Sequence, residues 1–213
     1  MEPFKTHTGL VVPLDRINVD TDQMVPKQFL GWLTRDGIGR VLFYDWRYLE
    51  GERPNPEFVL NDPRYAGASI LLGRANFACG SSREHAVWAA KDYGLRVIIA
   101  PSFSDIFYNN CLKNGILPIR LPEDQMDLLF QRTTDHEGYR LAVDLHAQTI
   151  NEVVPGGPGA VHIPFEMDAF QRECLMKGLD DIRVTLRFED KIIDFEKRNN
   201  PTLHLYGTLP ASS

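Results

Sequence analysis

The sequence predicts an α/β domain in which parallel strands are covered by helices. In the middle of the chain, short apolar runs typical of buried strands alternate with longer segments of helical character. Two of these helical segments are followed by a glycine, Gly94 and Gly115, as helix ends often are. A β-α-β-α-β rhythm favours parallel strands, because each helix carries the chain back across the sheet. In the last third, apolar and polar residues alternate, which adds some antiparallel strands to the class.

The N-terminal third is the least regular part of the sequence. Residues 10–14 (LVVPL) predict a short strand. The following DRINVDTDQMVPKQFL mixes turn-forming and apolar residues, which suits a loop that leads into a short helix. Residues 50–64 are rich in proline and are expected to be mainly loop.

The central elements share strong apolar patterning. The predicted strands are 68–72 (ASILL), 96–100 (RVIIA) and 116–121 (ILPIRL). The predicted helices are 82–93, 102–114 and 123–131. Pro118 has no N–H to donate to a neighbouring strand, so the third strand is expected at a sheet edge or strand end.

The last third predicts a different mixture of elements. They are a strand at 139–150, a glycine-rich turn in VPGGPGA, a short strand at 161–165, a helix at 170–177 that stops at Gly178, and an amphipathic helix at 189–199. No strong internal boundary is visible. We therefore expect one domain over residues 1–200 and a loose C-terminal tail over 201–213.

Composition and charge exclude several classes of function. The formal net charge of −6 argues against nucleic acid or an anionic membrane as the main partner. The first residues lack the layout of a signal peptide, and no apolar run is long enough for a membrane helix. Three widely spaced cysteines indicate a reducing, cytoplasmic compartment rather than a disulfide framework. Because the chain has no CxxC and no paired histidines, we predict no metal or cofactor site on this chain alone.

The segment Cys79–His85 (CGSSREH) carries the clearest chemical signal. It follows a predicted strand and opens a predicted helix, an arrangement that presents backbone N–H groups to an anion. Arg83 could grip a carboxylate through two hydrogen bonds. The alternative is structural, since Ser81 and Glu84 have the spacing of a capping box. A serine hydrolase or a dinucleotide site is disfavoured, because the chain shows neither GxSxG nor GxGxxG here.

At these residues the chain resembles a known family. Five segments carry the resemblance, in this order: VDTDQMVPKQFL, FYDWRY, GSSREH, DYGLRVIIAPSFSDIFYNNCLKNGILPI and FQRECLMKGLDDI. Their sequences and their order resemble those of small subunits of bacterial 3-isopropylmalate dehydratase, in the aconitase superfamily. The resemblance runs from about Leu10 to about Leu186. Several long matching segments in the same order are far more specific than any single motif.

The resemblance implies a fold, a partner and a reaction. The fold would be a swivelling β/β/α domain, similar to the fourth domain of aconitase, that docks over an active-site cleft. The [4Fe–4S] cluster would belong to a separate large subunit. The reaction would be the isomerisation of 2-isopropylmalate to 3-isopropylmalate through 2-isopropylmaleate, a step of leucine biosynthesis. A related hydro-lyase, acting on citraconate, methylmalate or homoaconitate, is the close alternative.

The resemblance also assigns roles to individual residues. Ser81 would be the catalytic base, and Asp22 an orienting or proton-relay carboxylate beside it. Ser82, Arg83 and Thr21 would bind the dicarboxylate substrate. From the sequence pattern alone, a solvated turn or a helix N-cap is the simpler interpretation of Asp20-Thr21-Asp22-Gln23.

A second group of residues would set substrate specificity. The stretch KQFLGWL aligns with the specificity loop of the superfamily, and the residues concerned are Lys27, Phe29, Leu30, Trp32 and Leu33. Its apolar members could form a pocket for the isopropyl group. The alternative is that they are core residues of a short amphipathic helix.

The residues just before Ser81 raise two further points. The family usually has glycine where this chain has Ala78, a change that matters only if the position needs a positive φ. Cys79 is expected to be a small packed side chain rather than a ligand. A different class of function, a binding or assembly module with GSSREH as a mere helix cap, would show no association with a large subunit.

Overall fold

The computed structural model describes residues 1–31, 34–80, 83–154 and 157–199. The chain divides into two compact units, Met1–Gly178 and Leu179–Ser213. The predicted domain extent of 1–200 remains a prediction, and the expected tail lies outside the described residues. All residues proposed for the site belong to the first unit.

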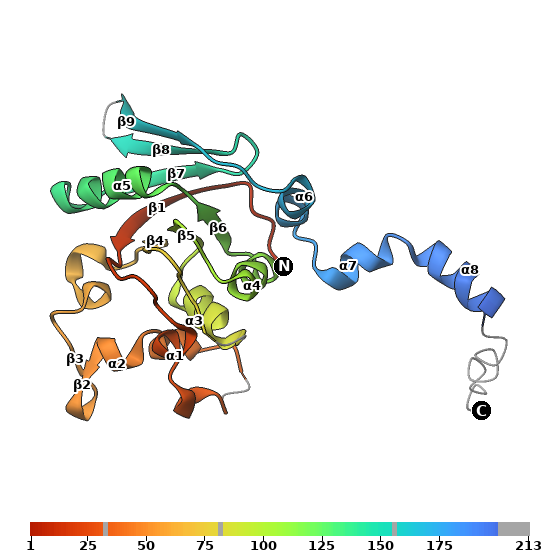
Figure 1. Ribbon diagram of the computed structural model, residues 1–213, viewed down its shortest axis with the longest axis horizontal. Helices are drawn as coiled ribbons and strands as arrows, with labels where there is room; N and C mark the ends of the chain where they lie inside the picture. The colour runs from red at the N-terminus through yellow and green to blue at the C-terminus, as the bar shows by residue number, and fades with distance from the viewer. Residues whose placement is uncertain (32–33, 81–82, 155–156, 200–213) are drawn as a thin grey trace, which may run out of the picture. The chain divides into compact units, whose positions relative to one another are not determined.

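The first unit is built on a seven-stranded sheet with the order β6-β5-β4-β1-β7-β8-β9 (Figure 1). The strands are β1 (Thr6–Pro13), β4 (Ile70–Leu72), β5 (Val97–Ala100), β6 (Leu117–Arg120), β7 (Arg140–Asp144), β8 (Thr149–Val154) and β9 (Gly157–Pro164). β1 joins the two halves of the sheet. Its residues 11–13 pair in parallel with β4, and its residues 6–10 pair antiparallel with β7.

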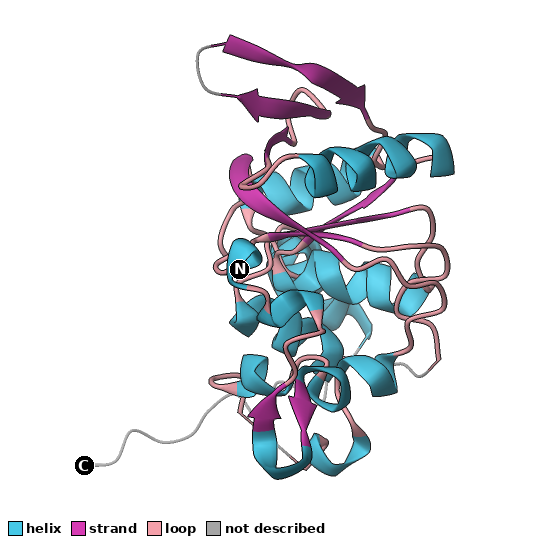
Figure 2. Cartoon of the chain, turned by 90° about the vertical axis from the view of Figure 1, so that its left-hand side faces the viewer, coloured by secondary structure: helices cyan, strands magenta, loops and turns pink. Residues whose placement is uncertain are grey.

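The parallel half confirms the fold class that the sequence predicts. Every residue of β4 and β5 is buried, because helices cover both faces of this part of the sheet. Helices α3 (His85–Tyr93) and α4 (Asp105–Asn114) lie on one face and α5 (Glu123–Asp135) on the other (Figures 1 and 2). Gly94 and Gly115 end α3 and α4 in the left-handed conformation, as predicted. The strand that contains Pro118 lies at the sheet edge, also as predicted.

The antiparallel half differs in detail from the prediction. The strand expected over 139–150 is two strands, β7 and β8, which pair with each other as a hairpin. The turn between them includes Gln148, which has a positive φ of 54°. Alternation continues through both strands, so the pattern does not reveal the turn. Helix α6 (Ala169–Lys177) matches its prediction and ends at Gly178.

The segment between β1 and β4 consists of short elements around the candidate site. They are α1 (Thr21–Met24), η1 (Lys27–Phe29), η2 (Ile38–Val41), α2 (Tyr44–Arg47), the strand pair β2 (Tyr48–Leu49) and β3 (Arg53–Pro54), η3 (Glu50–Glu52), η4 (Val59–Asn61) and η5 (Pro63–Tyr65). Residues 50–64, expected to be mainly loop, contain short 3-10 turns and one of these small strands. Phe43 and Phe58, from different parts of this segment, pack with ring centroids 5.9 Å apart and extend the apolar core.

The second unit contains two described helices, α7 (Asp181–Leu186) and α8 (Glu189–Asn199). The sequence predicts α8 with the correct bounds, whereas it does not predict α7. Asp180 begins α7 by accepting a hydrogen bond from the backbone N–H of Arg183 at 2.8 Å. This N-cap is the local signal that the sequence analysis missed.

Candidate active site

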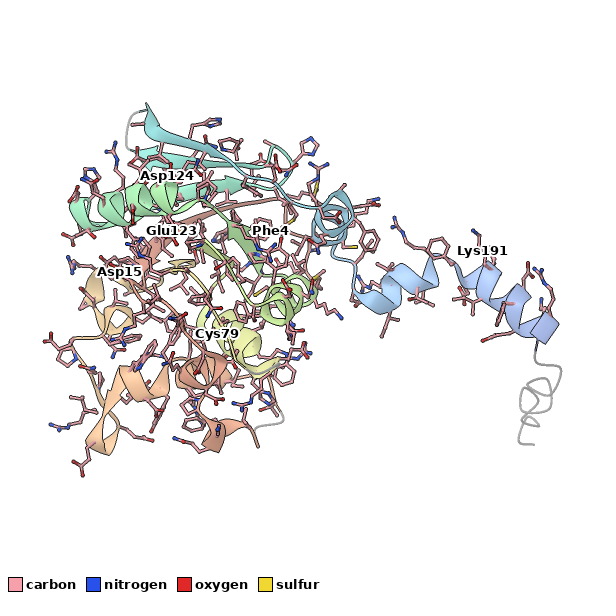
Figure 3. The ribbon with its side chains drawn as sticks, in the orientation of Figure 1. Phe4, Asp15, Cys79, Glu123, Asp124 and Lys191 are labelled. Carbon is pink, nitrogen blue, oxygen red and sulfur yellow. The ribbon has the colours of Figure 1, made fainter. Side chains whose placement is uncertain are left out.

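The candidate site lies at the carboxyl ends of β1 and β4, where the two loops that follow these parallel strands meet. The N–H of Cys79 donates to the carbonyl of Val19 at 3.0 Å, and the N–H of Thr21 donates to the carbonyl of Cys79 at 3.0 Å. Asp20 and Cys79 therefore form an isolated parallel bridge. Cys79 lies beside α1 (Figure 3). In open α/β sheets, ligands bind outside the carboxyl ends of the strands, so the location suits a functional site.

Helix α1 begins with a complete capping box. The Asp20 carboxylate accepts from the N–H groups of Asp22 at 2.7 Å and Gln23 at 2.8 Å, and the Gln23 side chain accepts from the Asp20 N–H at 2.9 Å. The N-cap interpretation of this segment is therefore confirmed for Asp20. Capping by Asp20 leaves the carboxylate of Asp22, two residues later, available for other contacts.

Asp22 pairs with Arg83, which brings together two residues that the sequence analysis assigned to one site. Nη1 of Arg83 forms an ion pair with Oδ1 of Asp22. The other carboxylate oxygen of Asp22 lies 3.6 Å from Nζ of Lys27. Asp22 thus lies between one cation from the segment after β4 and another from η1. Its negative charge holds the Arg83 guanidinium in place.

The capping box given as the alternative for Ser81 and Glu84 does not match the described start of α3. Helix α3 begins at His85, three residues later than predicted, and Glu84 is its N-cap residue with no side-chain capping bond. The Glu84 carboxylate is engaged elsewhere: Oε1 accepts from Nδ2 of the buried Asn114 at 2.8 Å and lies 3.8 Å from Arg35. Ser81 and Ser82 lie outside the described residues.

Ala78 occupies a backbone conformation that favours glycine. Its φ is 55°, and its side chain is fully buried. The left-handed region costs an L-residue about 1–2 kcal/mol because its Cβ is crowded. Asn76 and Gly80 also have positive φ values, of 58° and 91°. Position 78 therefore has the positive φ at which alanine, in place of the glycine usual in the family, makes a difference.

Thr21 and Cys79 differ in their exposure to solvent. Thr21 is only 2% exposed, and its hydroxyl oxygen would lie 3.8 Å from a Cβ at Gly80. Cys79 is half-buried, and its thiol donates to the carbonyl of Asn18 at 3.7 Å. These contacts agree with the packed role expected for Cys79. They also place Thr21 directly beside the backbone of Gly80.

The specificity loop is described only in part. Lys27 contacts Asp22, and Phe29 packs edge-on against Tyr44 with ring centroids 4.8 Å apart. Phe29 also lines a pocket of about 240 Å³ together with Arg40, Val41, Tyr44, Tyr48 and Glu52. Leu30 is half-buried, whereas Trp32 and Leu33 lie outside the described residues. Because Phe29 both lines a pocket and packs against the core, both interpretations of the loop stay open.

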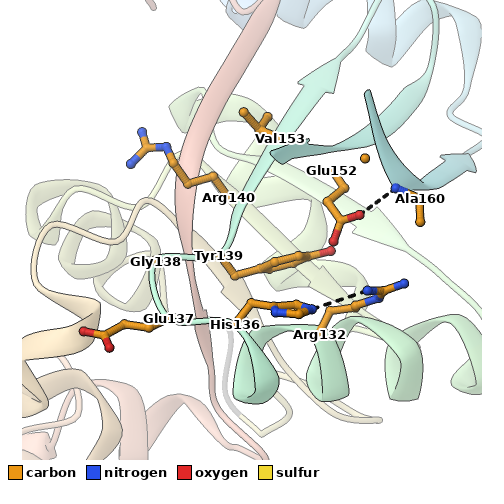
Figure 4. A pocket seen from close by; sticks show the side chains of 10 residues that line it. Arg132, His136, Glu137, Gly138, Tyr139, Arg140, Glu152, Val153 and Ala160 are labelled. Carbon is orange, nitrogen blue, oxygen red and sulfur yellow. Dashed lines mark hydrogen bonds between the residues drawn. The ribbon is translucent and has the colours of Figure 1, made fainter. Parts of the chain in front are cut away.

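A larger pocket of about 680 Å³ is lined by residues of α5, β7, β8 and β9 (Figure 4), and none of its lining residues is a predicted site residue. The buried Glu152 accepts from the N–H of Ala160 at 2.7 Å, and the Tyr139 ring lies beside it. Burial and the neighbouring Glu152 carboxylate raise the pKa of Tyr139 well above its ordinary value. No motif in the sequence predicts this pocket. It brings together residues from α5, β7, β8 and β9, which no local pattern links.

Two features of the described residues concern metals and membranes. No group of three or more His, Cys, Asp or Glu side chains within these ranges is arranged to hold a metal ion. Cys111 is fully buried in α4, and burial raises its thiol pKa well above the ordinary value. Among the helices described, none has both the length and the apolar character needed to cross a membrane.

Known proteins resemble this chain over most of its length. The family model described as the aconitase C-terminal domain matches residues 1–124, and the LeuD_N model matches residues 127–169. A 3-isopropylmalate dehydratase small subunit from Brevibacillus brevis is 53% identical over 198 residues, covering 93% of this chain and 100% of the relative. A crystal structure of 3-isopropylmalate dehydratase from Methanocaldococcus jannaschii matches with a TM-score of 0.62 at 25% identity, covering 90% of this chain and 99% of the other.

Proposed function

We propose that this chain, which belongs to the family of 3-isopropylmalate dehydratase small subunits, contributes half of the active site of that hydro-lyase in leucine biosynthesis. The observation that carries the proposal is the Asp22–Arg83 ion pair. It joins the two segments that the family resemblance assigns to the site. The name of the relative implies a large subunit as the partner.

The reaction explains why these residue types are needed. Removing water from a 2-hydroxy acid requires a base for a weakly acidic C–H and a Lewis acid for the leaving hydroxyl. We assign the Lewis acid to a [4Fe–4S] cluster of the large subunit. The three cysteines of this chain are far apart in sequence, and Cys111 is buried in the core, so they do not fit the ligand set of a cluster.

Ser81 is proposed as the base. A serine hydroxyl is a weak base at its ordinary pKa, so it needs positive potential nearby to hold the negative charge of an alkoxide. Arg83, two residues later, supplies a cation, and the start of α3 contributes the positive end of a helix dipole. Asp22 orients Arg83 through their ion pair.

Ser82, Arg83 and Thr21 are proposed to bind the carboxylates of the substrate. Arg83 suits this role, because its guanidinium matches a carboxylate with two parallel hydrogen bonds. The Asp22 carboxylate pairs with Nη1 of that guanidinium. A substrate carboxylate would therefore bind beside Asp22, with Lys27 offsetting the negative charge of Asp22.

Substrate preference is proposed to depend on the loop that contains Phe29 and Leu30, with Trp32 and Leu33. A pocket discriminates one methylene by only about 1–3 kcal/mol, so related alkyl-malates are expected to react more slowly rather than not at all. A panel of 2-isopropylmalate, citraconate, methylmalate and homoaconitate distinguishes this function from the related hydro-lyases. The highest kcat/KM should fall on 2-isopropylmalate.

The catalytic assignment is tested by Ser81→Ala in the complex reconstituted with the large subunit and its cluster. We expect kcat to fall by a factor of about 10³ or more, because the base is removed. Ser69→Ala is the matched control and should keep wild-type kcat, since Ser69 lies before β4 and hydrogen-bonds His7 rather than the site. Full dehydratase activity in Ser81→Ala would refute the assignment of Ser81 as the base.

A further inference from the structure

We propose that Ser104 is a positioning residue of the candidate active site, whose hydroxyl holds Ala78 in its left-handed conformation and so fixes the segment that leads to Ser81. The inference rests on the proposed function of Ser81. Ser104 lies in the loop between β5 and α4, within residues that the sequence analysis expected to be helical.

The Ser104 hydroxyl makes two contacts. It donates to the carbonyl of Ala78 at 2.7 Å and accepts from the backbone N–H of Phe107 at 3.3 Å. The second contact is the N-cap of α4. One hydroxyl therefore ties the start of a helix to the carbonyl of the residue with a positive φ.

The peptide group between Ala78 and Cys79 is fixed from both sides. Its carbonyl oxygen accepts from the Ser104 hydroxyl at 2.7 Å, and its N–H donates to the carbonyl of Val19 at 3.0 Å. One contact comes from the start of α4 and the other from the segment just before α1. Rotation of this peptide would break both bonds, so the direction of the chain into Gly80 depends on them.

Ser102 supports the same pairing of loops. The N–H of Asn76 donates to the Ser102 hydroxyl at 2.8 Å, and the N–H of Phe77 donates to the Ser102 carbonyl at 2.9 Å. The N–H of Ser104 in turn donates to the carbonyl of Phe77 at 3.1 Å. The loop before α4 thus runs alongside the loop after β4. In the loop after β4, Ser104 contacts Ala78, whose side chain is buried and whose backbone is left-handed.

A glycine at position 78 would reach the same φ without crowding. The need for the Ser104 hydrogen bond should therefore be greatest with alanine at this position. Helix capping alone makes a different prediction, because it would affect stability without regard to the residue at position 78.

Three substitutions of Ser104 separate the two roles. Ser104→Thr keeps both the donor and the cap, Ser104→Gly keeps most of the cap but has no donor, and Ser104→Ala loses both. In the reconstituted complex, we expect the Gly and Ala variants to lose about tenfold in kcat with little change in KM, because a misplaced base affects the chemical step. The Thr variant should stay near wild type. Wild-type kcat in Ser104→Gly would overturn the proposal.

The coupling to Ala78 is tested by a double-mutant cycle. Ser104→Ala should cost about tenfold in kcat with Ala78 and less than about threefold in the Ala78→Gly background. Equal losses in both backgrounds would contradict the proposal.

The variants of the same double-mutant cycle are also compared by urea unfolding of the chain. This measurement needs no activity, so it remains decisive if the wild-type complex proves inactive and the proposed function fails. Midpoint shifts that are not additive are expected, whereas additive shifts would overturn the coupling of Ser104 to Ala78.

Discussion

Asp22 and Arg83 form an ion pair between the two segments of this chain that make up the candidate site. The Arg83 side chain is 23% exposed and that of Asp22 is 37% exposed, so solvent screens their attraction only in part. Removing the carboxylate would leave Arg83 without its partner. The guanidinium would then be free to turn away from the position proposed for substrate binding.

Asp22→Asn should therefore lower kcat/KM of the reconstituted complex by about 10- to 100-fold, because the amide keeps the shape of the side chain but loses its charge. Steady-state kinetics with 2-isopropylmalate measure the effect. Glu173→Gln is the matched control, since Glu173 forms a surface ion pair with Lys177 within α6 and its loss should leave the kinetics unchanged. Wild-type kcat/KM in Asp22→Asn would show that this ion pair is not needed for activity.

Ala78 supports a prediction about stability. Ala78→Gly relieves strain worth about 1–2 kcal/mol but loses a buried methyl group and a less flexible backbone, so the free energy of unfolding should change by less than about 1 kcal/mol. Ala78→Val adds a branched Cβ in the left-handed region of a filled core and should cost about 2–4 kcal/mol. Urea unfolding measures both. Equal stability of the Val and Ala proteins would contradict the strained conformation.

Asp22, Arg83 and Ala78 differ in how much of their structural role can be predicted from the sequence. The family resemblance identifies Asp22 and Arg83, but their contact depends on the pairing of two loops that are far apart in the chain. The positive φ of Ala78 has no signature of its own in the sequence, because alanine is common everywhere. Only the glycine usual in the family points to it.

At the scale of elements, the parallel half of the sheet is easier to predict than the starts of its helices. Buried strands such as β4 and β5 have continuous apolar runs, which the sequence displays directly. The start of α3 lies at His85, and the Glu84 carboxylate binds Asn114 of α4, a tertiary contact that the local sequence does not reveal. The β7–β8 hairpin escapes prediction because strand-like alternation runs through its turn.

His7 on β1 provides a pH prediction for the sheet. Its Nε2 lies 2.8 Å from the Ser69 hydroxyl just before β4, and burial, with Arg96 and Arg140 nearby, lowers the pKa of His7 below its ordinary value of 6.5. The folded chain therefore binds this proton less readily than the unfolded chain. Between the lowered pKa and 6.5, stability must fall as the pH falls.

The free energy of unfolding should therefore drop when the pH is lowered below about 6.5, and the drop should be smaller in His7→Gln. Urea unfolding at several pH values measures this difference. His146→Gln is the matched control, because it makes the same substitution at an exposed histidine in the turn between β7 and β8. An identical acid sensitivity in His7→Gln would show that His7 is not its source.

At the scale of the whole molecule, the chain is one part of an enzyme. Its family relationship covers 93% of its length, and the described site residues Thr21, Asp22 and Arg83 belong to the loops that follow β1 and β4 in the first unit. The proposed chemistry needs a Lewis acid that we assign to the large subunit. The cytoplasmic location expected from the three widely spaced cysteines stays a prediction.

The most direct measurement is a titration of the cluster-loaded large subunit with this chain, followed by assay of 2-isopropylmalate dehydration. Each component alone should be inactive, and activity should rise with added chain until it reaches a plateau at a fixed ratio of the two subunits. Addition of the Ser81→Ala chain should produce no comparable rise. Full activity of the large subunit alone, or no activity at any ratio with a loaded cluster, would contradict the account.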